Sequence, residues 1–185
     1  MRLGTAVVVL LVVVCSAHAA SFSEQELRDE YYASESSSKA SDKFYEKMKS
    51  VAEDAPPVQL GYKGMSALLK SKHSINPKNK LSYFSEGKQL LEQAISRAPE
   101  NVELRFLRYG VQDNAPFFLD YTENLKEDRK ALVSYLASVD INNGIPDLAS
   151  RIAQYLNDQG DLSSDEQPAV ARISDACKKG NSCQS

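Results

Sequence analysis

Apolar residues recur every three or four positions along nearly the whole chain after residue 20. This spacing places them on one face of an α-helix, whereas a half-buried β-strand would alternate apolar and polar residues. The sequence contains no convincing alternating segment. The pattern therefore predicts an all-α protein whose successive helices form antiparallel hairpins.

The N-terminal segment, residues 20–57, is predicted to form two helices separated by a serine-rich break, SESSSKAS. Ser23 and Glu26 have the spacing of a capping box, which marks the start of the first helix. The second helix is expected over about residues 41–53, because the two prolines that follow cannot continue it. The break leaves open whether the first helix packs firmly on the rest of the chain.

A helical hairpin is predicted for residues 58–99. Its first helix carries Gly61 and Gly64 on the same face as Leu68, and each glycine disfavours the helix by about 1 kcal/mol relative to alanine. Close approach of a neighbouring helix would compensate for this cost. The second helix is expected to begin at Pro77, because proline suits the first turn of a helix.

The stretch from Asn101 to Asp128 is predicted to be an elbow between two helices. The first of them is apolar on two opposite sides, so neighbours are expected to pack against both. Pro116 ends this helix, and PFFLDY is expected to cross over as a short apolar plug. The apolar residues on the two sides are Leu104, Leu107 and Val111 on one, and Val102, Phe106 and Tyr109 on the other.

Three residues, Gly87, Ala94 and Pro99, match the small, alanine and proline positions in the second half of a tetratricopeptide repeat. The first half fits poorly, because SKHSINPKNK lengthens the turn beyond a repeat of about 34 residues. More broadly, residues 58–136 resemble an uncharacterised family of exported bacterial proteins with tetratricopeptide-like helices. This resemblance rests on the segment LLEQAISRAPENVELRFLRYGVQDNAPFFLDYTENLKED. The resemblance implies hairpins stacked as a short, degenerate tetratricopeptide-like array over residues 58–176, and it implies no activity.

Residues 1–19 have the layout of a secretory signal peptide, with Arg2, an apolar run and a final Ala-His-Ala. An uncleaved anchor is one alternative, because residues 3–20 approach the roughly 20 apolar residues that span a bilayer. Lipid attachment at Cys15 is another, which Val14 disfavours. Cleavage predicts a secreted or extracytoplasmic protein, in the periplasm or cell envelope of a bacterium, without stable membrane insertion.

Loss of the signal leaves 21 basic and 25 acidic residues, a net charge of −4. A mildly acidic surface argues against nucleic-acid binding, which needs a basic patch to neutralise phosphates. Residues 177–185 form the predicted tail, where Cys177 and Cys183 are expected to close a small disulfide loop in an oxidising compartment. A dithiol redox site is the alternative, although five residues separate the cysteines where such motifs usually have two.

Reaction chemistry is not evident in the sequence. His73 lies at a predicted helix end and has no neighbours with metal-ligand spacing. The acidic residues of the elbow lack the spacing of a calcium-binding loop, so we expect them to cap helices and pair with arginines. We therefore expect no metal and no cofactor. The acids are Asp113, Asp120, Glu123, Glu127 and Asp128, and the arginines are Arg105, Arg108 and Arg129.

Two functional hypotheses follow. The first is a non-catalytic helical module that holds a protein or peptide partner, and the alternative is an enzyme or small-ligand binder centred on Arg105, Arg108 and the nearby acids. Arg105, Arg108 and Gln112 share one strip of the elbow helix and are the candidate binding residues. We expect Arg105 to be buried and paired with acids, and Arg108 to be more exposed. An open groove lined by these groups would favour the alternative, and a filled core would favour the first hypothesis.

If residues 1–19 are a cleaved signal, the native protein should begin at Ala20 or Ser21. Intact-mass measurement or N-terminal sequencing of protein from the producing cells checks this. Met1 retained on membrane-bound protein would contradict the prediction and favour the anchor.

Overall fold

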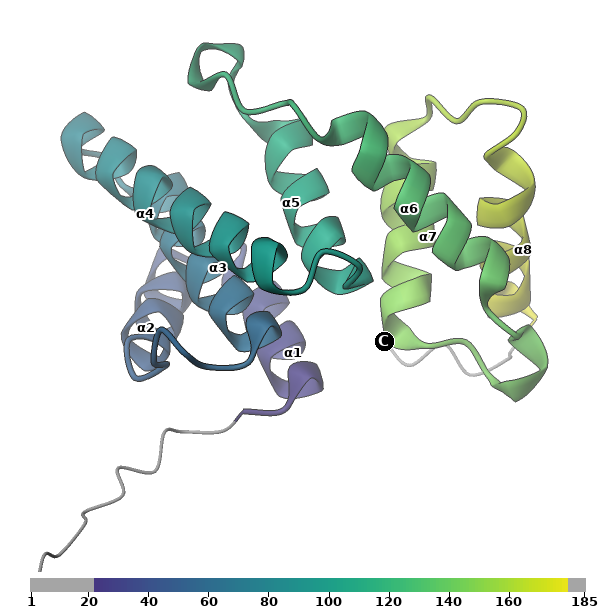
Figure 1. The fold of residues 1–185 in the computed structure, drawn as a ribbon, viewed down its shortest axis with the longest axis horizontal. Helices are drawn as coiled ribbons and strands as arrows, with labels where there is room; N and C mark the ends of the chain where they lie inside the picture. Colours follow the sequence, from purple (N-terminus) through teal and green to yellow (C-terminus); the bar gives the residue numbers. More distant parts are fainter. Residues whose placement is uncertain (1–21, 180–185) are drawn as a thin grey trace, which may run out of the picture.

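The computed structural model describes residues 22–179, which form eight α-helices and two short 3-10 helices and contain no β-strand (Figure 1). The prediction of an all-α fold is thus confirmed. The signal peptide and Cys183 lie outside the described residues, so cleavage and the disulfide stay predictions. The α-helices are α1 (Glu24–Ser34), α2 (Ser38–Met48), α3 (Pro57–His73), α4 (Pro77–Arg97), α5 (Val102–Asn114), α6 (Leu125–Ser138), α7 (Asp147–Gln159) and α8 (Gln167–Lys178).

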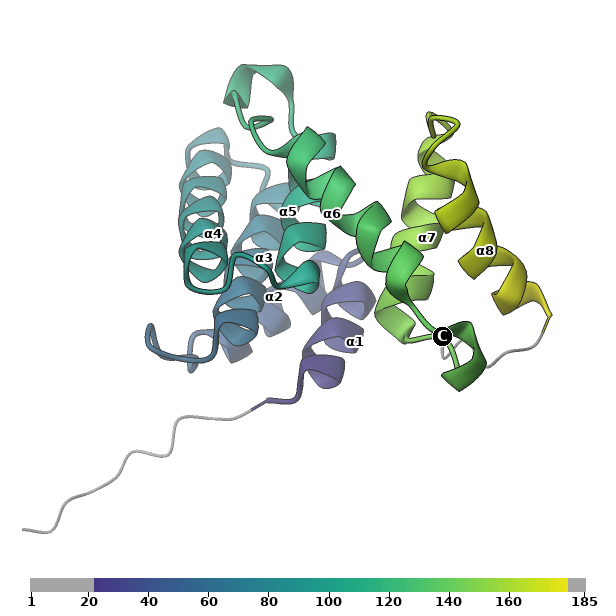
Figure 2. The ribbon, with the colours of Figure 1, turned by 45° about the vertical axis from the view of Figure 1, so that its right-hand side comes forward.

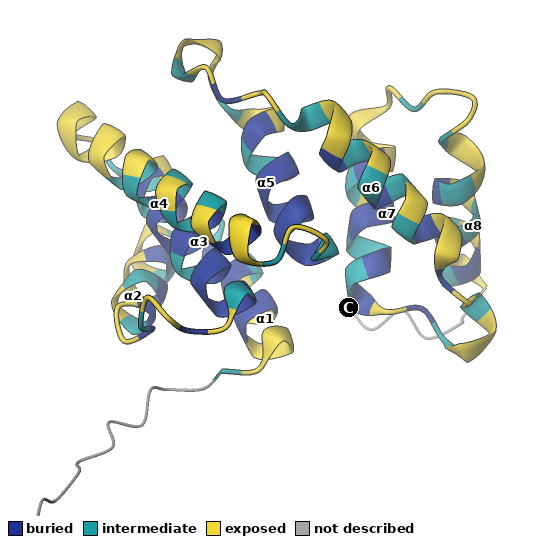
Figure 3. Ribbon diagram, in the orientation of Figure 1, coloured by how far each residue is buried: buried dark blue, intermediate teal, exposed yellow. Residues whose placement is uncertain are grey.

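Helix α5 lies between two apolar cores and belongs to both. Leu104 and Leu107 face a core shared with α1 to α4, whereas Phe106 and Tyr109 face a second core shared with α6 to α8. Most of the α5 ribbon is coloured as buried in Figure 3, and α5 stands between the two groups of helices in Figure 1. The prediction of neighbours on both sides of this helix is confirmed.

The N-terminal helices are firmly packed. Ser23 caps α1 by accepting a hydrogen bond from the Glu26 amide at 3.1 Å, as the sequence predicts. Helix α2 begins at Ser38, three residues earlier than expected, because Ser37 within the serine-rich break caps it. Leu27 is completely buried, so α1 is part of the first core rather than a loosely attached arm.

Helices α3 and α4 form the predicted hairpin, and their backbones touch. A Cβ atom added to Gly64 would lie 2.8 Å from the carbonyl oxygen of Gly87 and 2.9 Å from the amide nitrogen of Leu91. An added Cβ at Gly87 would lie 2.7 Å from the Gly64 carbonyl oxygen. The close helix approach that was predicted to offset the low helix propensity of these glycines is therefore present where α3 and α4 cross.

Helix α6 crosses beside α5 and leads to the α7–α8 pair, as Figure 2 shows from the side. Leu132 and Leu136 of α6 are completely buried in the second core, together with Ile152 of α7 and Ile173 of α8. None of the helices within residues 22–179 has both the length and the apolar character needed to cross a bilayer.

Alanine at Gly64 should destabilise the fold by about 1–3 kcal/mol, because overpacking against rigid backbone outweighs the gain in helix propensity. Gly110 of α5 provides the matched control, since an added Cβ there meets no described atom within 4 Å. Gly110→Ala should stabilise the fold by up to about 1 kcal/mol. Urea unfolding of the two variants measures both effects. Equal stabilities for the two variants would contradict the close crossing.

Candidate functional site

A buried carboxylate joins α5 to α6. Asp128 of α6 is 0% exposed, and it accepts hydrogen bonds from Arg108 Nε at 2.7 Å and Arg108 Nη2 at 2.8 Å. Arg105 Nη1 adds a third bond to the same carboxylate at 3.2 Å. We call Arg105, Arg108 and Asp128 the elbow cluster. Burial would by itself lower the pKa of Arg108, but the bonds to Asp128 outweigh it and raise that pKa.

The two arginines of the elbow cluster make further hydrogen bonds within the fold. Arg105 Nε donates to the Pro99 carbonyl at 2.6 Å, and Arg105 Nη1 also donates to Glu127 at 3.0 Å. Arg108 Nη1 donates to Glu92 at 3.1 Å. The prediction that Arg105 is buried and paired with downstream acids is confirmed. The predicted greater exposure of Arg108 is wrong, because Arg108 is the main partner of Asp128.

Gln112, the third candidate binding residue, is buried beside this cluster. Its amide exchanges two hydrogen bonds of 3.2 Å with Asn124, one to the side-chain oxygen and one from the backbone nitrogen. Arg105, Arg108 and Gln112 therefore come together as predicted, but they form a closed polar layer between α5 and the start of α6. Arg105 lines a pocket with Glu100 and Glu127, but neither Arg108 nor Gln112 lines it, so the three side chains do not share one open surface.

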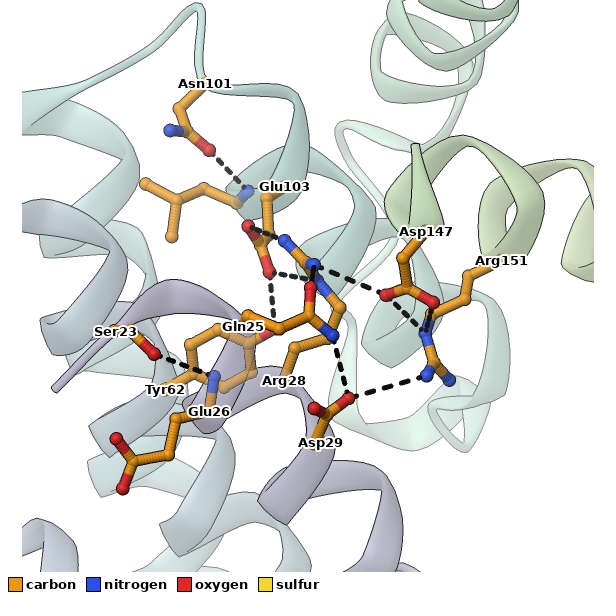
Figure 4. Close-up of polar contacts among 11 residues, drawn as sticks. Ser23, Gln25, Glu26, Arg28, Asp29, Tyr62, Asn101, Glu103, Asp147 and Arg151 are labelled. Atoms are coloured by element: carbon orange, nitrogen blue, oxygen red, sulfur yellow. Dashed lines mark hydrogen bonds and ion pairs between the residues drawn. The ribbon is translucent and has the colours of Figure 1, made fainter. Parts of the chain in front are cut away.

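A second buried cluster, which the sequence analysis did not predict, links four helices (Figure 4). Arg28 of α1 forms two hydrogen bonds with Glu103 of α5, at 2.9 and 2.8 Å, and a longer one with Asp147 of α7 at 3.3 Å. Tyr62 of α3 donates to the same Glu103 at 2.5 Å. Burial and the charge of Glu103 raise the pKa of the Tyr62 hydroxyl, so this hydroxyl stays protonated. We call these four residues the Arg28 cluster.

An apolar groove opens beside α5, at the end away from the Arg28 cluster. Helix α5 is close to α3 at one end, where an added Cβ on Gly61 would lie 2.3 Å from Leu104 Cδ2. At the other end of α5, an added Cβ on Gly110 would meet no atom of a neighbouring element within 4 Å. The cavity has a volume of about 940 Å³. Its walls are α3, α4, α5, the end of α1 and the turn after α5, and its main apolar lining is Tyr32, Met65, Leu68, Phe84, Leu107 and Val111.

Exposed apolar side chains stand at the edges of this groove. Leu81 of α4 is 59% exposed and Phe118 of the turn is 71% exposed, and both line the cavity. Phe117 is 91% exposed beside Phe118, but it does not line the cavity. The prediction that PFFLDY is a buried plug is therefore wrong for both phenylalanines, whereas Tyr121 at its end is buried.

The polar groups of the groove are few. Lys72 and Lys80 line it from the α3–α4 hairpin, and Glu35 lines it from the end of α1. Burial raises the pKa values of the Tyr31 and Tyr155 hydroxyls, which further favours their neutral form. Across the described part of the chain, no group of three or more histidine, cysteine or acidic residues is arranged to hold a metal ion.

The adjacent pair of phenylalanines at positions 117 and 118 is a signal in the sequence that could have indicated the groove. No protein-family model, curated protein or solved structure matches the chain. The resemblance to exported proteins with tetratricopeptide-like helices thus stays an expectation, and the functional argument rests on geometry.

The elbow cluster predicts unequal effects for its two arginines. Arg108→Ala should lower the free energy of unfolding by about 3 kcal/mol or more, because it removes the two short bonds to buried Asp128. Arg105→Ala leaves those bonds intact and should cost about 1–2 kcal/mol. Glu127→Ala is the control, since its exposed carboxylate should contribute less than about 1 kcal/mol. Urea melts measure all three, and a larger loss for Arg105→Ala would contradict this order.

Proposed function

We propose that the mature chain is a non-catalytic helical module that binds a protein or peptide partner in the groove beside α5. The observation that carries this proposal is an apolar cavity of about 940 Å³ with exposed Leu81 and Phe118 at its edges. Exposed apolar surface that borders a concave site is typical of a place where a partner binds. Covering such side chains would contribute about 1.5–3 kcal/mol each.

The positions of the arginines support this proposal over an enzyme or small-ligand site centred on them. Arg105 and Arg108 lie in the elbow cluster, where carboxylates and a backbone carbonyl of the chain itself use their donors. An anionic ligand that replaced Asp128 in these bonds would leave an unpaired buried charge. A filled core with paired arginines is the arrangement expected of the binding module.

The proposed architecture is a short, degenerate tetratricopeptide-like array. Helices α3 and α4 would be its first hairpin, and α5 and α6 the second, with the groove between them. The direct crossing of α3 and α4 at Gly64 and Gly87 is consistent with tightly paired helices within a repeat unit. With the predicted signal peptide, the proposal places the module outside the cytoplasm.

Affinity capture with matched variants tests the proposed site. The mature chain is the bait for the extracytoplasmic fraction of the producing cells, and retained proteins are quantified by mass spectrometry. Phe118→Asp and Leu81→Asp should each reduce the specifically retained partner by about tenfold or more, because a charge in the groove cannot be covered by apolar surface.

Two exposed apolar residues outside the groove provide the controls for this experiment. Phe117 and Ile75 are 91% and 99% exposed, respectively, and neither lines the groove. Phe117→Asp and Ile75→Asp should retain the partner as the unchanged chain does. If all four variants retain it equally, the groove is not the binding site. Circular dichroism confirms that each variant is folded.

A further inference from the structure

The charge of the α3–α4 hairpin differs from that of the rest of the chain. Residues 55–85 contain no aspartate or glutamate, although acidic residues outnumber basic ones in the sequence as a whole. The same stretch carries five lysines and one histidine, which are Lys63, Lys70, Lys72, His73, Lys78 and Lys80. The hairpin that forms one wall of the groove is therefore locally basic.

Three of these lysines lack a partner within the fold. Lys63 donates to the Val51 carbonyl, and Lys70 pairs with Asp42 at 3.1 Å. In contrast, the exposed side chains at positions 72, 78 and 80 form no ion pair with any residue in 22–179. They gather where α3 ends and α4 begins, and we call Lys72, Lys78 and Lys80 the lysine rim.

Two of the three residues of the lysine rim border the apolar part of the groove directly. Lys72 and Lys80 line the cavity together with apolar residues from the same two helices, such as Leu68 and Phe84. Glu35 is the single carboxylate among the lining residues, so basic groups are in excess. A ligand that fills this site meets apolar surface along its length and positive charge along one edge.

The dimensions of the groove suit a short helix. The lining residues of α3 extend from Met65 to Lys72, and those of α4 from Pro77 to Phe84. At a rise of about 1.5 Å per residue, each wall is roughly 10 Å long, or about two helical turns. Apolar residues at positions i, i+3, i+4 and i+7 of an amphipathic helix cover a face of the same length.

We infer that the groove binds the apolar face of a short amphipathic helix whose adjoining edge is acidic and faces the lysine rim. This inference rests on the proposed function and names the chemistry of the partner. The apolar face packs against the walls and the exposed Leu81 and Phe118, while the acidic edge pairs with Lys72, Lys78 and Lys80. Charge complementarity of this kind selects the partner and fixes its orientation in the groove.

Selection from a display library of helical 18-residue peptides tests the inference without knowledge of the natural partner. Peptides recovered on the mature chain should combine an apolar face with a net negative charge on one flanking edge. Selection on a Lys72→Glu, Lys78→Glu, Lys80→Glu variant should lose the enrichment of acidic residues. The best acidic peptide should bind this variant about tenfold more weakly, and its binding to the unchanged chain should weaken as salt is raised.

A second triple variant controls for net charge. Lys126, Lys130 and Lys179 are exposed, and none of them lines the groove. Lys126→Glu, Lys130→Glu, Lys179→Glu changes the net charge by the same amount as the rim variant does. The acidic peptide should bind this control within about twofold of the unchanged chain. An equal loss in both triple variants would overturn the inference, because it would reflect net charge alone.

Other results would also overturn the inference. These are the recovery of no peptide, of peptides without acidic enrichment, or of peptides whose binding survives Phe118→Asp. If no helical peptide is recovered, and the protein sediments with phosphatidylglycerol vesicles only when the lysine rim is intact, the site binds an anionic membrane instead. If the peptide selection fails but capture of the natural partner still depends on Phe118 and Leu81, only the inferred chemistry of the partner is wrong. If capture does not depend on these two residues either, the proposed function itself is contradicted.

Discussion

The structure depends on the burial of α5 between two cores, which leaves this helix almost no solvent-facing side for its charged residues. Glu103, Arg105 and Arg108 are all buried. A buried charge is tolerated only when hydrogen-bonded partners replace water. The Arg28 cluster satisfies Glu103, and the elbow cluster satisfies the two arginines. The positions of α1, α6 and α7 relative to α5 follow in part from this requirement.

The same arrangement explains where the groove lies. Helix α5 is held against α3 at its first turns, where Leu104 fills the space left by Gly61. Gly110, near the other end of α5, lines the groove, and the chain then turns through exposed Phe117 and Phe118 before α6 begins. The groove thus lies beside a helix that the buried clusters hold in place, and its walls from α3, α4 and α5 belong to helices that also pack in the first core.

Local patterns in the sequence were sufficient to predict the helices, the two-sided burial of α5 and the close approach at Gly64. These features depend on residues that are near one another in the chain. The Arg28 cluster was missed because Arg28 and Glu103 are 75 positions apart, and neither residue indicates its partner. Phe117 and Phe118 were misplaced for a related reason, since an apolar pair within a turn does not indicate whether it faces the core or solvent.

The Arg28 cluster has a consequence for how the chain unfolds. Arg28 belongs to a helix of the first core and Asp147 to a helix of the second, while Glu103 lies on the helix that both cores share. Opening either core would break hydrogen bonds that this cluster makes to the other, at a cost of about 1.5–3 kcal/mol for each bond to a charged group. We therefore expect the unfolding of the two cores to be energetically coupled.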